Sequence, residues 1–284
     1  MLMTPAKPYP TLVQALGLLL LVLLLQLFLG VVAGFAGEIL GIPLGPVTLS
    51  AVNLASFAIV LALGLHRTGA TAREVFPLRP IRPGLVLPIV MTTLGLNTLM
   101  SEADNLLNYF LPRPAFIEEL FRELLPSGTQ IWATAMALVI VAPLTEELLF
   151  RGLILRGFLL SYTTRASMLL SAFLFAALHV NPWQFLPAFT FGLVLAWWFV
   201  HTRSLVPCLL GHALNNGIPV LLIAFPIAEI PGYTGIPAEG VAFQPVWFTL
   251  LGLALFGAGM TLTARQFRAI APPAEPPEPP LPAP

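Results

Sequence analysis

Long runs of apolar residues, separated by short segments rich in proline, glycine or charge, dominate this chain. A helix needs about 20 mostly apolar residues to cross a bilayer, and most of the runs approach that length. The predicted spans are Leu12–Gly34, Thr48–Leu65, Leu85–Leu99, Ile131–Leu155, Ala166–Val180, Trp183–His201, Leu205–Phe225 and Val246–Ala264. The pattern predicts an all-α, polytopic membrane protein with about eight transmembrane helices.

Composition places the chain in the same class. Hydrophobic residues make up 57% of the 284 positions and charged residues 9%, whereas a typical soluble domain has about 25% charged residues. A formal net charge of zero gives no reason to expect a nucleic-acid partner, so membrane lipid is the predicted surrounding. The single cysteine, Cys208, excludes an internal disulfide framework.

The basic residues predict how the spans are oriented. With a cytoplasmic N-terminus, only Arg113 and Arg122 fall outside, which is the asymmetry that the positive-inside rule describes. The basic residues on the cytoplasmic side are then Lys7, Arg67, Arg73, Arg79, Arg82, Arg156, Arg165, Arg203, Arg265 and Arg268. We expect both termini to be cytoplasmic. The first run should remain as a span, because its apolar core exceeds the usual length of a cleaved signal peptide.

The chain divides into four stretches. Residues 1–130 hold the first three spans and an outer segment, Met100–Gln130, that is expected to form one or two short amphipathic helices. Residues 131–225 hold four core helices, and residues 226–270 hold an outer loop and the last span. Residues 271–284 form a proline-rich tail that is predicted to be disordered.

Three polar clusters interrupt the apolar core helices. An ionisable group at membrane depth costs about 2.5–3.5 kcal/mol on insertion scales, so such groups usually face a cavity where they have a function. The clusters are Glu146 and Glu147 with Arg151, Phe175 with His179, and His212 with Asn216. Counted at about 1.5 Å per helical residue, their depths are similar enough for one shared cavity. We expect that cavity to open toward the cytoplasm.

The first cluster contains one paired and one unpaired carboxylate. Residues four apart share a helix face, so Glu147 can pair with Arg151, whereas Glu146 is turned away. A carboxylate in a poorly hydrated pocket is suited to act as a general base. The alternative is a buried ion-pair cluster that only fixes helix packing.

The two histidine clusters repeat the four-residue spacing. His179 shares a face with Phe175, and His212 shares one with Asn216, so that both members of the second pair can donate hydrogen bonds toward one point. Asn215 is expected to point away from that face. A histidine in a membrane helix can also serve as a packing hydrogen bond.

Other intramembrane chemistries find less support in the sequence. An aspartyl dyad needs two aspartates, and Asp104 is the only one. No histidine is followed by glutamate, which excludes a zincin motif of the His-Glu-x-x-His type. Cys208 lies four residues before His212, so a thiol mechanism stays open beside the simpler reading of a small packing residue.

Together the clusters resemble the CPBP family of intramembrane proteases. The pattern is Glu-Glu-x-x-x-Arg at 146–151, Phe-x-x-x-His at 175–179 and His-x-x-x-Asn at 212–216, with Phe-Thr-Phe-Gly at 189–192. The family includes type II CAAX prenyl endopeptidases and bacterial proteins linked to bacteriocin processing or self-immunity. The resemblance covers roughly Ile131–Val220 and makes 131–225 the expected catalytic core.

The resemblance implies a role for each residue of the pattern. Glu146 would activate a water, His179 would hold it, and His212 and Asn216 would form an oxyanion hole. Glu147 and Arg151 would orient Glu146, with Phe175 as a supporting residue. The expected protein is then an intramembrane endopeptidase that acts on a membrane-associated protein or peptide. A lipid and a C-terminal membrane segment are two ways in which such a substrate could be attached, and the sequence does not identify it. The expected location is the plasma (inner) membrane of a bacterium.

Two kinds of alternative remain open from the sequence. Glu146, His179 and His212 are also a plausible zinc set. The metal-free mechanism is favoured, with no cofactor, because Asn216 suits an oxyanion and is a poor zinc ligand. A non-catalytic peptide binder or immunity protein, or a small-solute transporter, would be a different class. A transporter predicts inverted repeats or paired broken helices, and neither is found in the sequence.

Overall fold

A computed structural model describes residues 8–41, 44–114, 116, 119, 131–225, 229–234 and 240–269. Within these ranges all regular secondary structure is helical. The long helices are α1 (Leu12–Leu40), α2 (Pro46–Thr68), α4 (Val86–Phe110), α9 (Thr164–Leu178), α10 (Pro182–Thr202), α11 (Val206–Ala224) and α12 (Val246–Arg268). Between α4 and α9, residues 131–159 form one helical run made of α6 (Ile131–Ala135), the π-helical segment η3 (Met136–Val141), α7 (Ala142–Glu147), the π-helical segment η4 (Leu148–Leu155) and α8 (Arg156–Leu159). Two short elements, α3 (Ala72–Val75) and the 3₁₀ turn η1 (Pro83–Leu85), connect α2 to α4.

Each predicted span coincides with a helix or with the run 131–159, which confirms an all-α polytopic membrane protein. In the described part of the chain six helical stretches are long and apolar enough to cross a membrane: Leu12–Leu40, Pro46–Thr68, Pro83–Phe110, Pro182–Thr202, Val206–Ala224 and Val246–Arg268. The shorter α9 is also apolar but has only 15 residues.

The third helix departs from its predicted end. α4 continues past Leu99 to Phe110, so the first part of the expected outer amphipathic segment belongs to this helix instead. Its polar side chains reach neighbouring backbone: Asn105 donates to the carbonyl of Gly232 at 2.7 Å, and Glu102 accepts from the N–H of Gln244 at 2.9 Å. These contacts satisfy the groups that the sequence assigned to a water-exposed face. Most of the remaining segment, the proline-rich tail, Lys7 and Arg122 lie outside the described residues.

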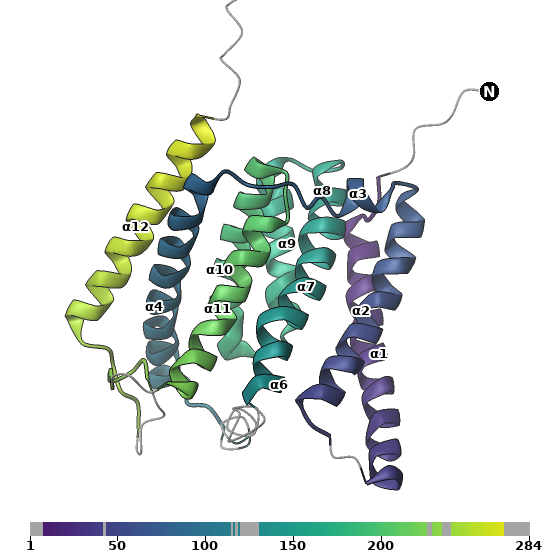
Figure 1. Cartoon of the computed structure of the whole chain (residues 1–284), viewed down its shortest axis with the longest axis horizontal. Coiled ribbons are helices and arrows are strands. Elements are labelled where there is room, and N and C mark those ends of the chain that lie inside the picture. Colours follow the sequence, from purple (N-terminus) through teal and green to yellow (C-terminus); the bar gives the residue numbers. More distant parts are fainter. Residues whose placement is uncertain are drawn as a thin grey trace, which may run out of the picture.

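The helices stand side by side in one bundle (Figure 1). α12 packs along α4, α9 and α10 form a hairpin beside α11, and α1 and α2 flank the run 131–159. Small residues bring α4 and α12 into close contact, as in other membrane bundles. A Cβ atom at Gly95 would lie 2.3 Å from the backbone nitrogen of Phe256, so only glycine fits there.

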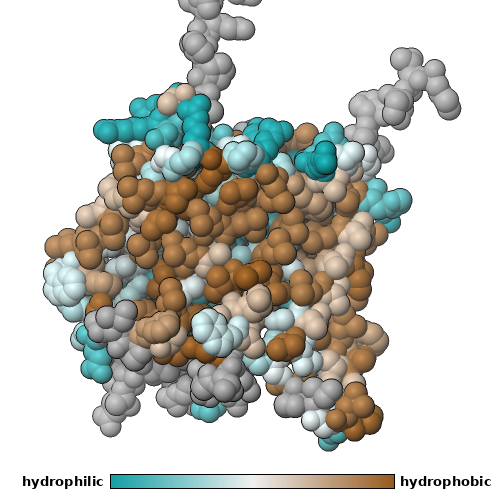
Figure 2. Space-filling view, viewed as in Figure 1, coloured by the Kyte–Doolittle hydropathy of each residue, from teal (hydrophilic) through white to brown (hydrophobic). Residues whose placement is uncertain are grey.

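One end of the bundle is rich in arginine. Arg67 lies at the end of α2, Arg156 begins α8, Arg165 opens α9, Arg203 follows α10, and Arg268 ends α12. Figure 1 shows that the chain enters α1 and leaves α12 at this same end. In Figure 2 the hydrophilic surface gathers there, above a broad apolar belt. This arrangement fits the predicted topology, in which that end faces the cytoplasm.

The orientation can be tested by cysteine labelling. In a Cys208→Ser background, cysteines placed at Arg73 and at Pro114 should react with a membrane-impermeant maleimide from opposite sides of the membrane. Both positions are exposed. Arg73 precedes α4 in the chain and Pro114 follows it, so α4 separates them. Cys208 is buried, so its replacement should give a silent background. Labelling of both positions from one side would overturn the predicted number of spans between them.

Candidate active site

The helical run 131–159 carries the first cluster and is irregular for a local reason. Pro143 has no N–H, so it cannot donate to the carbonyl of a preceding turn. The N–H of Ala142 bonds to the carbonyl of Ala137, five residues back, as in a π-helix. The carbonyl of Leu138 therefore receives no backbone hydrogen bond from Ala142, four residues further along the chain, or from Pro143, five residues further along. Widened π-helical turns of this kind often occur at functional sites.

A buried ionic group forms the base of the site. Glu147 Oε1 accepts hydrogen bonds from Arg151 Nη1 at 2.7 Å and from His212 Nδ1 at 2.8 Å. The Glu147 and Arg151 side chains are both 0% exposed. The predicted pair between residues 147 and 151 is thus present, and it neutralises two charges that would otherwise be costly in this position.

The hydrogen-bond partners of Glu147 differ from those expected. The family resemblance implies that Glu147 and Arg151 orient Glu146, but the hydrogen bonds of Glu147 join Arg151 and His212. The reason is tertiary: α11 packs against α7 and places its histidine directly beside the ion pair. Spacing within one helix does not reveal this neighbour.

Arg151 makes two further contacts. Its Nη2 donates to the carbonyl of Gly192 at 3.0 Å, and its guanidinium carbon lies 4.7 Å from the centre of the Phe175 ring. A cation over an aromatic face gains stabilisation, particularly when both are desolvated. A Cβ atom at Gly192 would approach Ala172 and Phe175 to 3.2 Å, so glycine allows α9 and α10 to pack closely here. The sequence analysis quoted Gly192 within the 189–192 run without giving it a role.

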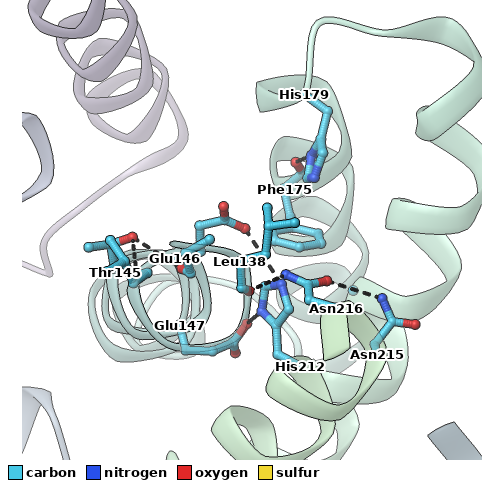
Figure 3. Close-up of polar contacts among 12 residues, drawn as sticks. Leu138, Thr145, Glu146, Glu147, Phe175, His179, His212, Asn215 and Asn216 are labelled. Atoms are coloured by element: carbon cyan, nitrogen blue, oxygen red, sulfur yellow. Dashed lines mark hydrogen bonds and ion pairs between the residues drawn. The ribbon is translucent and has the colours of Figure 1, made fainter. Parts of the chain in front are cut away.

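Glu146 lies beside His212 but has no cationic partner at hydrogen-bond distance. Its Oε2 is 3.8 Å from His212 Nε2, and its side chain is 17% exposed, unlike that of Glu147 (Figure 3). Figure 3 shows the carboxylate directed away from Glu147 and toward the space between α7 and α9. Glu146 is therefore the partly accessible carboxylate of the pair.

The remaining predicted residues surround this space. His179 follows the last residue of α9, and its Nδ1 is 3.0 Å from the carbonyl of Phe175. Because a carbonyl only accepts, Nδ1 carries the proton and Nε2 is the acceptor in the neutral ring. Asn216 Nδ2 donates to the carbonyl of Leu138 at 3.0 Å. Asn215 does not point away as expected, because its Nδ2 donates to Asn216 Oδ1 at 3.3 Å.

A cavity of ≈ 470 Å³ connects the two histidines and Asn216 to one end of the bundle, and Glu146 lies just outside its lining, 3.8 Å from His212 Nε2. Its inner wall includes Phe175, His179, His212 and Asn216, and its outer part includes Trp183 at the start of α10. More of the lining comes from the C-terminal halves of α4 and α11 and from the short segment 229–234.

The position of this cavity differs from the sequence expectation. We expected both termini and the cavity opening on the cytoplasmic side, but the cavity extends toward the end of the bundle away from Pro8 and Ala269. His179 directly follows the last residue of α9, at the end of that helix away from Arg165. If the arginine-rich end is cytoplasmic, the cavity faces the opposite side.

Comparison with known proteins bears on this arrangement. Residues 128–218 match the family described as type II CAAX prenyl endopeptidase Rce1-like. This stretch, which holds all three polar clusters, is therefore similar to that family. A second similarity is to the uncharacterized protein YyaK of Bacillus subtilis (strain 168), which is 33% identical over 149 residues, 46% of this chain and 48% of YyaK. The chain thus spans about half the length of this curated relative. No solved structure matches.

A metal site in residues 128–218 would depend on how their donor atoms are placed. The zinc alternative requires Glu146, His179 and His212 to converge on one ion. Within the described residues no group of three histidine, cysteine, aspartate or glutamate side chains is arranged to hold a metal. His212 Nδ1 is already bonded to Glu147, which leaves Nε2 as its available nitrogen.

The surroundings of Cys208 bear on the thiol alternative. Cys208 is fully buried and its Sγ donates to the carbonyl of Leu195 at 3.2 Å. It does not belong to the cavity lining around His212. The thiol therefore has the surroundings of a packing residue, not those of a reactive nucleophile.

Proposed function

We propose that this protein is an intramembrane endopeptidase that hydrolyses a peptide bond with a water activated by Glu146. The observation that carries the proposal is the contrast between two adjacent glutamates. Glu147 is buried, its Oε1 is bonded to Arg151 and His212, and its Oε2 is enclosed without a partner, whereas Glu146 is partly accessible and faces the same histidine at 3.8 Å. A base must be able to reach a water, and Glu146 is the accessible carboxylate of the two.

The chemistry follows from the positions of the side chains. Glu146 takes a proton from a water whose oxygen attacks the peptide carbonyl, and His179 Nε2 accepts the second hydrogen of that water. The tetrahedral intermediate carries its charge on the former carbonyl oxygen, to which His212 and the Asn216 N–H that is not bonded to Leu138 donate hydrogen bonds. The carbon–nitrogen bond then breaks as the proton passes from Glu146 to the leaving nitrogen. A carboxylate and an amine are released.

His212 has a defined state in this scheme. Nδ1–H donates to Glu147, so a neutral ring has only an acceptor at Nε2. To donate to an oxyanion the ring must carry protons on both nitrogens. The Glu147 carboxylate, which also pairs with Arg151, holds the ring by its Nδ1–H, in the way that a buried aspartate orients the histidine of a serine protease triad.

The substrate class follows from the location and the family. The cavity is part of the membrane-embedded bundle and has both polar and apolar walls, so a peptide attached to the membrane can reach it. We propose a membrane-associated protein or peptide as substrate, including one with a lipid or a C-terminal membrane segment. Comparison of membrane-protein termini in cells that carry the native protein or Glu146→Gln would identify it.

Two variants separate the metal-free mechanism from the zinc alternative. Removal of one oxyanion donor typically lowers kcat by about 10²–10³, and Asn216→Ala should do so while substrate binding persists. In a zinc enzyme, His212→Ala should lose the metal and Asn216→Ala should be mild. Kinetics of both variants, with metal analysis of the purified native protein, decide the question. Stoichiometric zinc together with unchanged kcat in Asn216→Ala would refute the glutamate mechanism.

A non-catalytic peptide binder is the second candidate function. It uses the same cavity and predicts that peptides bind to native protein and Glu146→Gln alike, with no new terminus formed in either case. The nearly unbonded position of Glu146 favours catalysis, because a binding protein has no need of an unpaired carboxylate in this costly place.

A further inference from the structure

A continuous series of hydrogen bonds reaches the site through side chains that the proposed reaction does not use. The hydroxyl of Tyr233 donates to Asn97 Oδ1 at 2.9 Å. Asn97 Nδ2 donates to Asn215 Oδ1 at 3.1 Å, and Asn215 Nδ2 donates to Asn216 Oδ1 at 3.3 Å. Asn216 Nδ2 completes the series by donating to the carbonyl of Leu138 at 3.0 Å. We call these side chains the asparagine chain.

The last acceptor fixes the direction of every bond in the chain. The carbonyl of Leu138 can only accept, so Asn216 must present its NH₂ group to it and its oxygen to Asn215. Asn215 must then donate to Asn216 and accept from Asn97. Leu138 is available because Ala142 bonds elsewhere and Pro143 has no N–H. A backbone irregularity therefore orients a side-chain amide on another helix.

The first donor is equally well defined. Burial raises the pKa of Tyr233 above its ordinary value of 10.0, so the phenol keeps its proton at neutral pH and can donate. The segment that carries it is fastened to α4, because the carbonyl of Gly232 accepts from Ser101 at 3.2 Å and from Asn105 at 2.7 Å. The chain thus begins on a docked surface segment and ends at the site.

We propose that Asn215, Asn97 and Tyr233 are positioning residues that keep the amide of Asn216 with its N–H groups toward the cavity. This inference rests on the proposed function, in which Asn216 donates to the oxyanion. One N–H of the amide is used by Leu138, and the other is available to a substrate. An amide rotated by half a turn would present its oxygen to a negative charge and oppose the reaction.

The kinetic test uses a nearly isosteric change. Asn215→Asp removes the donor to Asn216. We expect kcat to fall by about 10- to 10²-fold and KM to change little. This fall in kcat should not exceed the fall caused by Asn216→Ala, which removes the oxyanion donor itself. In an Asn216→Ala background the same change should cause no further loss, because its effect acts through Asn216. An equal further loss in that background would overturn the inference. Asn108→Asp is the matched control, since Asn108 only accepts a bond from the Arg113 N–H and lies outside the chain.

If Asn215→Asp folds poorly, the inference can still be tested with the variant Tyr233→Phe and with an NMR signal that does not depend on activity. Tyr233→Phe removes one neutral hydrogen bond and should lower kcat by about two- to tenfold. The sequence has seven asparagines, so the side-chain NH₂ signal of Asn216 can be assigned in ¹⁵N-asparagine-labelled protein by its loss in Asn216→Ala. Tyr233→Phe should shift that signal, although two side chains intervene, and Asn108→Asp should not.

The two measurements separate failure of this inference from failure of the proposed function. A shifted Asn216 signal in a native protein that cleaves no membrane peptide would support the chain and refute the peptidase. An active native enzyme whose Asn216 signal is unmoved by Tyr233→Phe, and whose Asn215 and Asn216 effects simply add, would overturn the positioning role and leave the peptidase intact.

Discussion

Glu146→Gln should abolish peptide cleavage while the protein still inserts and folds. Glutamine keeps the shape of the side chain but cannot take a proton from water, so the attacking nucleophile is not formed. Because Glu146 has no hydrogen-bonded cation to lose, its replacement should not disturb the buried ionic group. Single-turnover cleavage of a labelled peptide in detergent, with a melting temperature for each protein, measures both parts of the expectation.

The control for this change is Glu38→Gln, which removes an exposed carboxylate from α1, far along the chain from the site. It should leave turnover unchanged. Normal turnover by Glu146→Gln would refute the assignment of the base and, with it, the proposed mechanism.

Glu147→Ala should lower stability more than any other single change at the site. It leaves Arg151 buried without its ionic partner and removes the acceptor of His212 Nδ1. Breaking a buried ion pair from one side typically costs about 3–5 kcal/mol of unfolding free energy. Unfolding in mixed detergent micelles should reveal a loss of this size, accompanied by loss of activity.

The double variant Glu147→Ala with Arg151→Met provides the matched comparison. Removing both charges should recover much of the lost stability, because the cost lies in the uncompensated arginine and not in the absence of the pair. Activity should stay low, since His212 is no longer held. A Glu147→Ala protein as stable as the native one would show that Arg151 does not depend on this partner.

Much of the fold is encoded in local pattern and was therefore predictable. Apolar runs of near-membrane length mark the helices, because lipid requires every backbone group to be satisfied within the segment. The end of α4 was not predictable. Its charged residues look like a surface face, and only the arrival of Gln244 and Gly232 from a distant part of the chain shows how they are satisfied.

At the site too, contacts within one helix were predictable from the sequence and contacts between helices were not. The pairing of Glu147 with Arg151 follows from a four-residue spacing on one helix, and the sequence was sufficient for it. The bond from His212 to Glu147 joins residues on different helices, and the chain from Tyr233 to Asn216 joins several elements. Adjacent residues on a helix normally diverge, so the sequence assigned Asn215 to the wrong direction. The Leu138 carbonyl, which has no backbone donor, explains the difference. It accepts a hydrogen bond from Asn216 Nδ2, so Asn216 Oδ1 is available to accept one from Asn215.

The separation between the chain ends and the cavity has a practical consequence. α12 alone has 23 residues, and at about 1.5 Å per residue its length approximates the full height of the bundle. An affinity tag or fluorescent reporter inserted directly before α1 or directly after α12 would lie at the end of the bundle away from the cavity. Insertions at either position should leave the entrance of the cavity unobstructed, whereas an antibody fragment raised against residues 229–234 would cover it.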